Sequence, residues 1–358
     1  MNQIDSFLKM ALEKKGSDLH ILAGDAARVR INGDLQVLHQ DPLDQENVKE
    51  MLMEIMHENA REVFAANDGC DFAYSIHDVA RFRVNVFRHL GGLGAVFRAI
   101  PNAALSFEEL NLPEVMANMC LHKQGMILVT GKTGSGKSTT LAAMIDYINS
   151  RKGVHIITIE DPIEFVHHRK KALISQREVG VHTDSFAEAL HSALREDPDV
   201  VLVGELRDLE TVSIAVTAAE TGILVMGTLH TNGAAPTIDR LINMFPVDRQ
   251  AGIRTMLSTS LRGVVSQQLV KRKDDKGRMA ALEILVNSSA IGNLIRQGKI
   301  DQLENAIQSG AALGMRSMDS SLKELLDQRF IAGEEAYLKA FNKQTFEVYA
   351  PREKKKAG

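Results

Sequence analysis

The chain has 358 residues, of which 44% are hydrophobic and 25% charged, and its formal net charge is −4. One hydrophobic core rarely fills this length, so we expect two domains. The mild acidity argues against a protein that holds nucleic acid through its overall charge, although it does not exclude a local basic channel. Cys70 and Cys120 show neither metal-ligand spacing nor a disulfide framework, which favours a reducing compartment and cysteines buried in a core.

Residues 1–100 have the pattern of a small α+β domain. An amphipathic start predicts a helix, DLHILAG and ARVRING predict short strands, and residues 45–66 predict a second helix. After FAYSI, the stretch ARFRVNVFRHLGGLGAVFRAI predicts a hairpin with a turn at Gly91, Gly92 and Gly94. No apolar run reaches the roughly 18 residues that span a bilayer, and the start lacks a signal-peptide pattern. We therefore expect any membrane association to come through a partner.

A second domain follows a stretch bounded by Pro101 and Pro113. Four apolar runs, GMILVT, VHIITI, VVLVGE and ILVMGTLH, alternate here with helical stretches. Short apolar strands separated by helices predict a parallel sheet covered on both faces. The expected parts are a linker, an α/β domain, a helical region and a flexible tail, at residues 101–113, 114–287, 288–349 and 350–358.

GKTGSGKST, residues 131–139, fits the pattern G-x-x-x-x-G-K-[ST]. The glycines let successive backbone N–H groups turn toward a phosphate, and Lys137 brings a positive charge to the β and γ phosphates. Ser138 offers a hydroxyl to Mg²⁺ at the N-terminus of a predicted helix. A chance glycine-rich turn is the alternative, but the predicted strand and helix around the motif favour a nucleoside triphosphatase. The expected nucleotide-binding residues are Gly131, Lys132, Thr133, Gly134, Ser135, Gly136, Lys137, Ser138 and Thr139.

Polar residues follow the other apolar runs, where ligands of open α/β sheets bind. VHIITI is followed by Glu160, Asp161 and Glu164. VVLVGELRD places Glu205 where such enzymes usually carry a carboxylate that organises magnesium, and MGTLHTN carries His230. The alternatives are an acid at a helix N-terminus for Glu205 and a buried histidine satisfied by the backbone for His230.

The three acids that follow VHIITI have different expected roles. Glu160 and Glu164 are four apart with Pro162 between them, so an extended segment or a helical turn aims both at one site. With Glu205 assigned to the magnesium shell, one acid is still needed to orient or deprotonate the attacking water. We assign that role to Glu164, with Glu160 ordering metal-bound water or an arginine, and we expect Asp161 to be structural.

The ordered motifs GKTGSGKST, TIEDPIEF, LREDPDVVLVGELRD and TGILVMGTLHTN resemble the Walker A, Asp box, Walker B and His box of the secretion ATPase superfamily. SDLHILAG, ARFRVNVFR, NLIRQGK and GMRSMDSSL extend the resemblance nearly end to end, to the ATPases of type IV pilus retraction. It implies a PAS-like α+β domain joined to a RecA-like P-loop ATPase core with a helical C-terminal extension. It also implies ATP and Mg²⁺, a homohexamer, an inner-membrane platform protein as partner, and a cytoplasmic location, peripheral at the inner membrane.

The resemblance further implies that arginines of the N-terminal domain reach a nucleotide at a subunit interface. ARFRVNVFR alternates, so Arg81 and Arg83 share one strand face and are the candidates to assist phosphoryl transfer. Arg98 and Arg195 stand behind them as weaker candidates. Ordinary surface arginines on a half-exposed strand are the alternative.

The sequence also indicates which subfamily of these ATPases the chain resembles. Assembly ATPases of the superfamily generally carry an extra N-terminal domain and a four-cysteine zinc module, which a 358-residue chain with two cysteines does not fit. We therefore expect a retraction motor, with an accessory retraction ATPase, a paralogue of that motor, as the alternative. The segment AIGNLIR has Gly292 where the family usually has arginine, so the resemblance implies less about this segment.

Two other classes of protein are disfavoured. A RecA-like nucleic-acid translocase would need surfaces for stacking bases, but the chain has no tryptophan, four tyrosines and no basic-aromatic stripe. We expect no nucleic-acid partner. A scaffold that binds ATP without hydrolysing it is disfavoured because Glu164 and Glu205 are both present.

Overall fold

The computed structural model describes residues 2–31, 33–77, 79–100, 104–274 and 277–351. The chain divides into two compact units, of which the first comprises residues 1–103 with 162–166 and the second residues 104–161 with 167–358. Residues 101–103 of the expected linker and 352–358 of the expected tail lie outside the described residues. None of the helices in the described ranges is long and apolar enough to cross a membrane.

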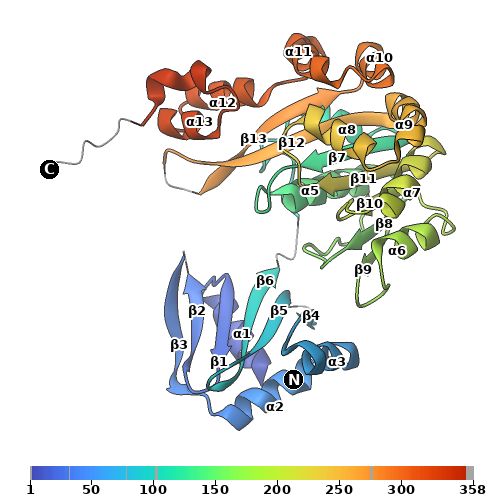
Figure 1. Ribbon diagram of the computed structural model, residues 1–358. Coiled ribbons are helices and arrows are strands. Elements are labelled where there is room, and N and C mark those ends of the chain that lie inside the picture. The colour runs from blue at the N-terminus through green and yellow to red at the C-terminus, as the bar shows by residue number, and fades with distance from the viewer. Residues whose placement is uncertain (1, 32, 78, 101–103, 275–276, 352–358) are drawn as a thin grey trace. The chain divides into compact units, whose positions relative to one another are not determined.

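In the described part of the first unit, six strands form an antiparallel sheet in the order β3-β2-β1-β6-β5-β4 (Figure 1). The strands are β1 (Asp18–Leu22), β2 (Ala26–Ile31), β3 (Asp34–Pro42), β4 (Gly69–Ile76), β5 (Ala80–His89) and β6 (Gly92–Ile100). The helices are α1 (Ile4–Glu13), α2 (Gln45–Ile55) and α3 (Glu58–Asn67). Apolar side chains of these helices and of the sheet, including Cys70, form one hydrophobic core, so the cysteine is a core residue as predicted.

The helix predicted over residues 45–66 is two helices. Met56 interrupts it with an extended backbone, φ −76° and ψ 119°. His57 is the N-cap of α3, because its ring Nδ1 accepts a hydrogen bond from the Ala60 N–H at 3.2 Å. A histidine at an N-cap is unusual enough that composition did not reveal the break.

Two other predictions for this unit need correction. The sequence pattern missed β3, because its side chains are almost all exposed and only its first four residues alternate between polar and apolar. The hairpin of β5 and β6 is present, but its turn lies at Leu90 and Gly91. Gly92 and Gly94 belong to β6, where the Phe87 ring would collide with a side chain on residue 94.

In the described part of the second unit, seven strands form a sheet in the order β13-β12-β7-β11-β10-β8-β9. All neighbours are parallel except β13, which pairs antiparallel with β12. The strands are β7 (Gly125–Thr130), β8 (His155–Glu160), β9 (Leu173–Glu178), β10 (Val200–Val203), β11 (Leu224–Leu229), β12 (Leu261–Lys271) and β13 (Arg278–Val286). The four predicted strands β7, β8, β10 and β11 are adjacent and parallel as expected, whereas β9, β12 and β13 were missed.

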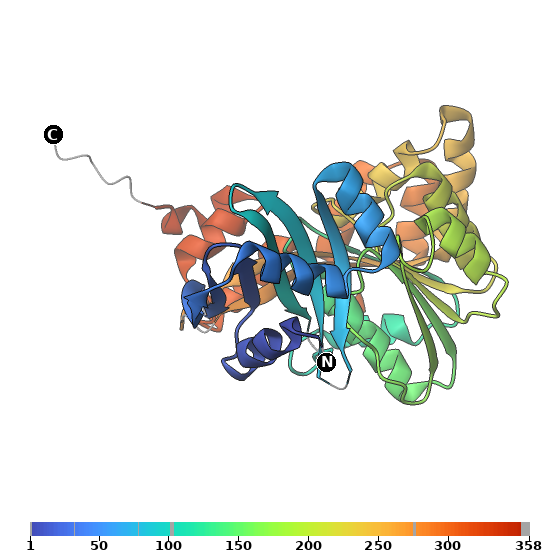
Figure 2. The ribbon, with the colours of Figure 1, turned by 90° about the horizontal axis from the view of Figure 1, so that it is seen from below.

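Helices cover both faces of this sheet, as the apolar runs predicted (Figure 2). The helices are α4 (Glu114–Cys120), α5 (Lys137–Arg151), α6 (Phe186–Ala193), α7 (Leu209–Glu220), α8 (Ala234–Asn243) and α9 (Val247–Ser260). Side chains of α4 and α5, among them the buried Cys120, pack on one face, and those of α6 to α9 pack on the other. Both faces are therefore dry, which explains the continuous apolar strands.

Helical segments dominate the chain after residue 287. They are α10 (Ser289–Gln297), α11 (Leu303–Ser309), α12 (Met318–Asp327) and α13 (Gly333–Lys339), with the 3₁₀ helices Ile300–Gln302, Ala311–Leu313 and Lys343–Tyr349. Residues of α12 and α13 form a small core with Val270 of β12 and Ala281 of β13.

The parallel register brings the carboxyl ends of the central strands to one edge of the sheet. Thr130 at the end of β7 pairs with Leu229 at the end of β11, and Val203 at the end of β10 pairs with Ile159 of β8. The loops that carry the predicted site residues of this unit all leave from that edge.

Candidate active site

The loop between β7 and α5 depends on its glycines. Gly131, Gly134 and Gly136 have φ angles of 142°, 77° and 88°, which residues with a Cβ rarely adopt. A Cβ on residue 131 would also lie 2.3 Å from the backbone oxygen of Gln267, so only glycine fits there. The loop can therefore bring its backbone close to a ligand.

The same loop fits a phosphate group. Helix α5 begins at Lys137 with Gly136 as its N-cap, and no side chain caps its first turn. The N–H groups of that turn and the partial positive charge of the helix favour an anion. Within the described residues, the buried Ser135 Oγ has no hydrogen-bond partner, and a phosphate oxygen would supply one.

Lys137 lies on the inner side of this loop, with 8% of the residue exposed. Its Nζ donates to the backbone oxygens of Gly131 at 3.0 Å and Lys132 at 3.3 Å, and it lies 3.4 Å from His230 Nδ1. Lys132 and Thr133 are exposed and line a hollow of about 600 Å³ together with Glu205, Arg207 and His230. Ser138 and Thr139 are half-buried in the first turn of α5.

Glu205 lines the same hollow as Lys132 and Thr133 of this loop. Its Oε2 lies 2.7 Å from Arg207 Nη2 and 3.2 Å from His230 Nε2. Burial by itself raises the pKa of Glu205, but the hydrogen bond from Arg207 and the charges of His230 and Arg207 outweigh it and lower the pKa overall. Glu205 is therefore an ionised carboxylate.

The structure excludes both alternatives for these two residues. Glu205 is not the acid at the N-terminus of α7, because Asp208 caps that helix by accepting from Thr211 N–H at 2.8 Å. His230 is not a buried histidine, because 41% of its side chain is exposed. Both side chains instead face each other above the strand ends.

Glu160 is held in place at the end of β8. Its Oε1 accepts hydrogen bonds from Thr158 Oγ1 at 2.6 Å and from Gln176 Nε2 at 3.2 Å. The same Gln176 side chain accepts from the backbone N–H of His167 at 2.8 Å. Asp161 is exposed, and its charge helps to raise the pKa of Arg207, after the larger effect of the hydrogen bond to Glu205.

Glu164, Arg81 and Arg83 belong to the first unit. Glu164 is exposed in the segment 162–166. Arg81 and Arg83 lie on β5 and share one face as predicted, with Arg81 half-buried and Arg83 exposed. The structure assembles Lys137, Glu205 and His230 in one site of the second unit. Glu164, Arg81 and Arg83 are not part of that unit.

The arginine candidates have neighbours of their own. Arg83 Nε lies 3.7 Å from Asp71, and Arg98 Nε donates to Asp18 at 2.9 Å. In the second unit, Arg195 donates to His191 Nδ1 at 2.7 Å.

Gln267 is a site residue that the sequence did not reveal. It is buried in β12, where its Oε1 accepts from Thr140 Oγ1 at 2.7 Å and its Nε2 donates to the Ser135 backbone oxygen at 2.8 Å. One side chain thus fixes both the phosphate loop and the first turns of α5. The only signal was a run of three polar residues, Ser266, Gln267 and Gln268, between the apolar pairs Val264–Val265 and Leu269–Val270.

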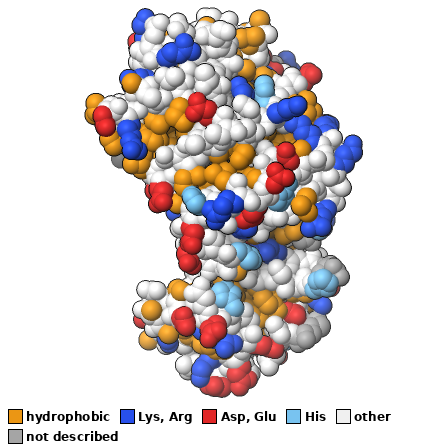
Figure 3. All heavy atoms as spheres, turned by 90° about the vertical axis from the view of Figure 1, so that its right-hand side faces the viewer, with side chains coloured by type: hydrophobic (Ala, Val, Ile, Leu, Met, Phe, Trp, Pro, Cys, Tyr) orange, Lys and Arg blue, Asp and Glu red, His pale blue; other side chains and the backbone are white. Residues whose placement is uncertain are grey.

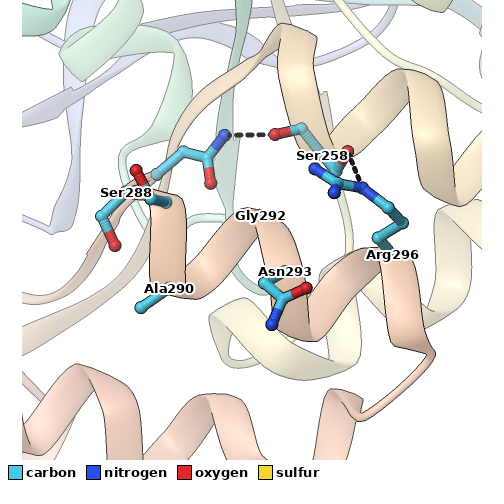
Figure 4. A pocket seen from close by; sticks show the side chains of 8 residues that line it. Ser258, Ser288, Ala290, Gly292, Asn293 and Arg296 are labelled. Atoms are coloured by element: carbon cyan, nitrogen blue, oxygen red, sulfur yellow. Dashed lines mark hydrogen bonds between the residues drawn. The ribbon is translucent and has the colours of Figure 1, made fainter.

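Gly292 lies in α10 and faces the C-terminal end of α9 (Figure 4). A Cβ on residue 292 would lie 2.7 Å from the Ser258 backbone oxygen. Asn287 Nδ2 donates to the same oxygen at 3.0 Å, and Arg296 Nε donates to Ser258 Oγ at 3.4 Å. The two helices therefore approach so closely that a side chain at this position would require one of them to shift.

The described residues contain no cluster of three or more His, Cys, Asp or Glu side chains arranged to hold a metal ion. A magnesium ion often takes only one or two protein ligands and binds the phosphates of its nucleotide. Ser138 in the first turn of α5 and Glu205 beyond β10 supply the oxygen ligands that such an ion prefers. These residues fit magnesium carried by a nucleotide.

The chain matches the family model described as Type II/IV secretion system protein over residues 1–327. It is 50% identical over 337 residues to the type IV pilus retraction ATPase PilT of Pseudomonas aeruginosa, covering 94% of this chain and 98% of that one. It is 41% identical over 334 residues to the type IV pilus ATPase PilU of the same organism, covering 93% and 87%. A solved structure of the pilus retraction motor PilT with bound ADP matches with a TM-score of 0.89 and 43% identity, covering 97% and 99%.

These comparisons confirm the resemblance that the four motifs indicated. The relatives extend over nearly the whole chain, and the motifs meet at one edge of the second sheet. The chain therefore belongs to the type II/IV secretion system protein family, as a P-loop ATPase of mixed α/β fold with two sheets.

Proposed function

We propose that this chain is a motor subunit that hydrolyses ATP to retract type IV pili. The observation that carries the proposal is the meeting of the phosphate loop, Glu205 and His230 at one sheet edge. PilT, a retraction ATPase by name, matches the chain over nearly its whole length. The chain would work as a homohexamer in the cytoplasm, bound at the inner membrane through a platform protein of the pilus machine.

The two units have separate roles in this proposal. The first is a PAS-like domain that supplies arginines, and the second is a RecA-like ATPase core at residues 114–287 with a helical extension at 288–349. The antiparallel sheet with helices on one face supports the first role. The parallel sheet with a phosphate loop after β7 supports the second.

The residues divide the chemistry among them. Backbone N–H groups of residues 131–139 and the Lys137 ammonium bind and orient the phosphates of ATP. Ser138 and Glu205 would hold Mg²⁺, which when bound would supply positive charge against the charge that develops on the phosphates. Glu164 orients or deprotonates the attacking water, with Glu160 and His230 ordering its surroundings. His230 suits that task because it contacts both Glu205 and Lys137.

Hydrolysis by the purified protein is the first test. The protein should hydrolyse ATP in the presence of Mg²⁺, and Lys137→Ala should abolish nucleotide binding because the loop loses its buried cation. Binding would be followed with a fluorescent ATP analogue. A wild-type protein that binds ATP without turnover would support the scaffold alternative instead.

A mixing experiment tests Arg81 and Arg83. A chain with Arg81→Ala and Arg83→Ala lacks the arginines, and a Lys137→Ala chain lacks the nucleotide site. If arginines act across a subunit interface, mixed hexamers recover hydrolysis, because some interfaces combine an intact site with intact arginines. Mixed rings without any recovered hydrolysis contradict an action in trans.

Deletion of the gene tests the cellular role. Cells without a retraction motor carry excess pili that do not retract, whereas cells without an assembly motor carry none. Bald cells would contradict the proposal. The accessory alternative, a PilU-like ATPase, predicts retraction that is weakened and not lost; the higher identity to PilT than to PilU favours the main motor.

Nucleic-acid translocation finds no support on the surface drawn in Figure 3. Acidic and basic side chains are interspersed there, and no continuous basic stripe crosses that face. Stimulation of hydrolysis by DNA or RNA would revive this class of function.

A further inference from the structure

Glu283 is a buried acid outside the catalytic residues named above. It lies on β13 opposite Ser266 of β12, and only 6% of the residue is exposed. Its Oε1 accepts from the backbone N–H of Ala234 at 2.7 Å, and its Oε2 accepts from that of Met318 at 3.3 Å. Ala234 is the first residue of α8, and Met318 is the first residue of α12 (Figure 1). One carboxylate therefore joins the N-termini of two helices.

This contact replaces an ordinary helix cap. Helix α8 has Gly233 at its N-cap and no side-chain cap of its own. An acid at a helix N-terminus satisfies free N–H groups and interacts favourably with the helix dipole. Burial raises the pKa of Glu283 even though both backbone N–H groups lower it, so the group is held in a dry environment by its two partners.

On one side, Glu283 fixes the loop that carries His230. The loop runs directly into α8, and the N–H of Gly233 donates to Ser266 Oγ at 2.8 Å. Thr237 in the first turns of α8 closes the loop, because its Oγ1 donates to the Gly233 backbone oxygen at 2.7 Å and lies 2.6 Å from Thr231 Oγ1. The β12–β13 hairpin therefore anchors the segment 230–237 at two points, Ser266 and Glu283.

On the other side, Glu283 fixes α12 to the same hairpin. Ser321 of α12 accepts from the Leu282 backbone N–H at 3.0 Å, and Ile284 exchanges backbone hydrogen bonds with Arg316 just before the helix. Met318 and Leu322 are buried in the small C-terminal core. Helix α12 thus has a fixed register on β13.

We propose that Glu283 is a positioning residue that makes the His230 loop and helix α12 move as one body. A change at His230 when nucleotide binds beside Lys137 then reaches the C-terminal helices through α8, Glu283 and α12. This inference rests on the proposed function, because it requires that the site binds ATP.

Glu283→Gln is the direct variant. A carboxylate accepts at both oxygens, whereas an amide accepts only at its oxygen and turns N–H donors toward the second backbone N–H. The substitution keeps the shape and breaks one of the two links. Ala234→Pro is a second route, because proline lacks the N–H and is tolerated at the first helical position. It removes the link to α8, because its Cδ replaces the N–H beside Glu283 Oε1 and turns that oxygen away, while the hydrogen bond from Met318 to Oε2 can remain.

Asp319→Asn provides the matched control. Asp319 lies on α12 and, like Glu283, accepts from two backbone N–H groups, those of Phe341 at 2.8 Å and Asn342 at 2.9 Å. The variant makes the same change from carboxylate to amide, but the hydrogen bonds of Asp319 lie wholly within the C-terminal region that follows β13. Loosening of the C-terminal helices alone would therefore appear in this control.

Hydrogen exchange of the full chain, with and without a non-hydrolysable ATP analogue, tests the coupling. In wild type, the analogue should slow exchange at residues 230–237 and also at residues 318–322. Glu283→Gln and Ala234→Pro should lose the nucleotide-dependent protection at 318–322, and Asp319→Asn should keep it. Protection at 318–322 that persists in both coupling variants, or that is also lost in Asp319→Asn, overturns the inference.

The wild-type result separates this inference from the function itself. Protection at 230–237 without any at 318–322 refutes the coupling and leaves the ATPase intact. A wild-type protein that does not bind the analogue refutes the proposed nucleotide site, and the coupling with it. If Glu283→Gln fails to fold, Ala234→Pro still decides between these outcomes.

Discussion

Arg207 Nη2 lies 2.7 Å from Oε2 of Glu205, the carboxylate assigned to the magnesium shell. The two side chains differ in exposure: 59% of the arginine side chain is exposed, compared with 18% of the glutamate side chain. The guanidinium can therefore leave at little cost, while the carboxylate stays in the site. Arg207 and a magnesium ion would compete for the same oxygen.

This competition predicts a lower magnesium requirement for Arg207→Ala. An exposed ion pair is worth about 1 kcal/mol at most, so the magnesium concentration for half-maximal hydrolysis should fall by up to about fivefold. A magnesium titration of hydrolysis at saturating ATP measures it. Arg88→Ala is the control, because Arg88 is a similarly exposed arginine whose carboxylate partner is Asp68. An unchanged or higher requirement would show that Arg207 does not compete.

Substitution of Glu164 and of Glu205 separates their roles. Glu164→Gln should keep ATP binding and lower turnover by about a hundredfold or more, the usual worth of a general base. Glu205→Gln should raise the magnesium concentration that half-maximal hydrolysis requires, because it removes an ionised carboxylate from the proposed magnesium shell. Single-turnover hydrolysis and analogue binding measure both effects. Substantial residual hydrolysis in Glu164→Gln would move the role of base to Glu160 or Glu205.

Gln267→Leu should weaken nucleotide binding. The substitution leaves Thr140 Oγ1 and the Ser135 backbone oxygen without their partner, at about 1–3 kcal/mol for each buried group. The loop then has to be ordered by the nucleotide itself. Titration with the ATP analogue measures the loss of nucleotide affinity, and thermal unfolding measures the loss of stability. Gln268→Leu, the next residue of the strand, is the control, because it bonds to Lys339 O at 3.3 Å and not to the loop.

Gly292→Ala should destabilise the packing of α10 on α9. The added Cβ would lie 2.7 Å from a backbone oxygen, which cannot rotate away, so we expect a loss of about 1–3 kcal/mol in the free energy of unfolding. Chemical denaturation measures it. Asn293→Ala, on the exposed side of the same helix, should change little. Equal stability of the two variants would mean that α10 can shift to admit a side chain.

His167 predicts a pH dependence of stability. Burial lowers its pKa from 6.5 to about 4, so the folded chain keeps the neutral ring while the unfolded chain binds a proton below pH 6.5. Stability from this group is present above pH 6.5 and is lost as pH falls toward 4, by about 3 kcal/mol at most. Wild type should therefore lose more stability over this range than His167→Leu. His168→Leu, at the exposed neighbour, should follow wild type.

The elements that the sequence predicted well are those whose burial is uniform. Strands such as β7 and β11 are buried on both faces, so their side chains are apolar without interruption. The sequence pattern did not predict β3, because nearly all of that strand is exposed. It did not predict β12, because Ser266 and Gln267 are polar residues inside a buried strand. Those polar residues are explained by the loops beside them, because Gln267 bonds to the phosphate loop and Ser266 accepts from Gly233 in the loop that follows His230.

The sequence by itself determined the phosphate loop, because glycines at positive φ and a lysine at fixed spacing form the site within nine consecutive residues. It also named Glu205 and His230, since both directly follow buried strands. Only the tertiary structure decided which groups hold them: Arg207 and His230 on Glu205, Gln267 on the loop, and Glu283 between α8 and α12. Apart from Arg207, these partners are distant in the chain and meet because of the strand order β13-β12-β7-β11-β10. Such contacts depend on the pairing of strands, which local patterns of apolar and polar residues do not encode.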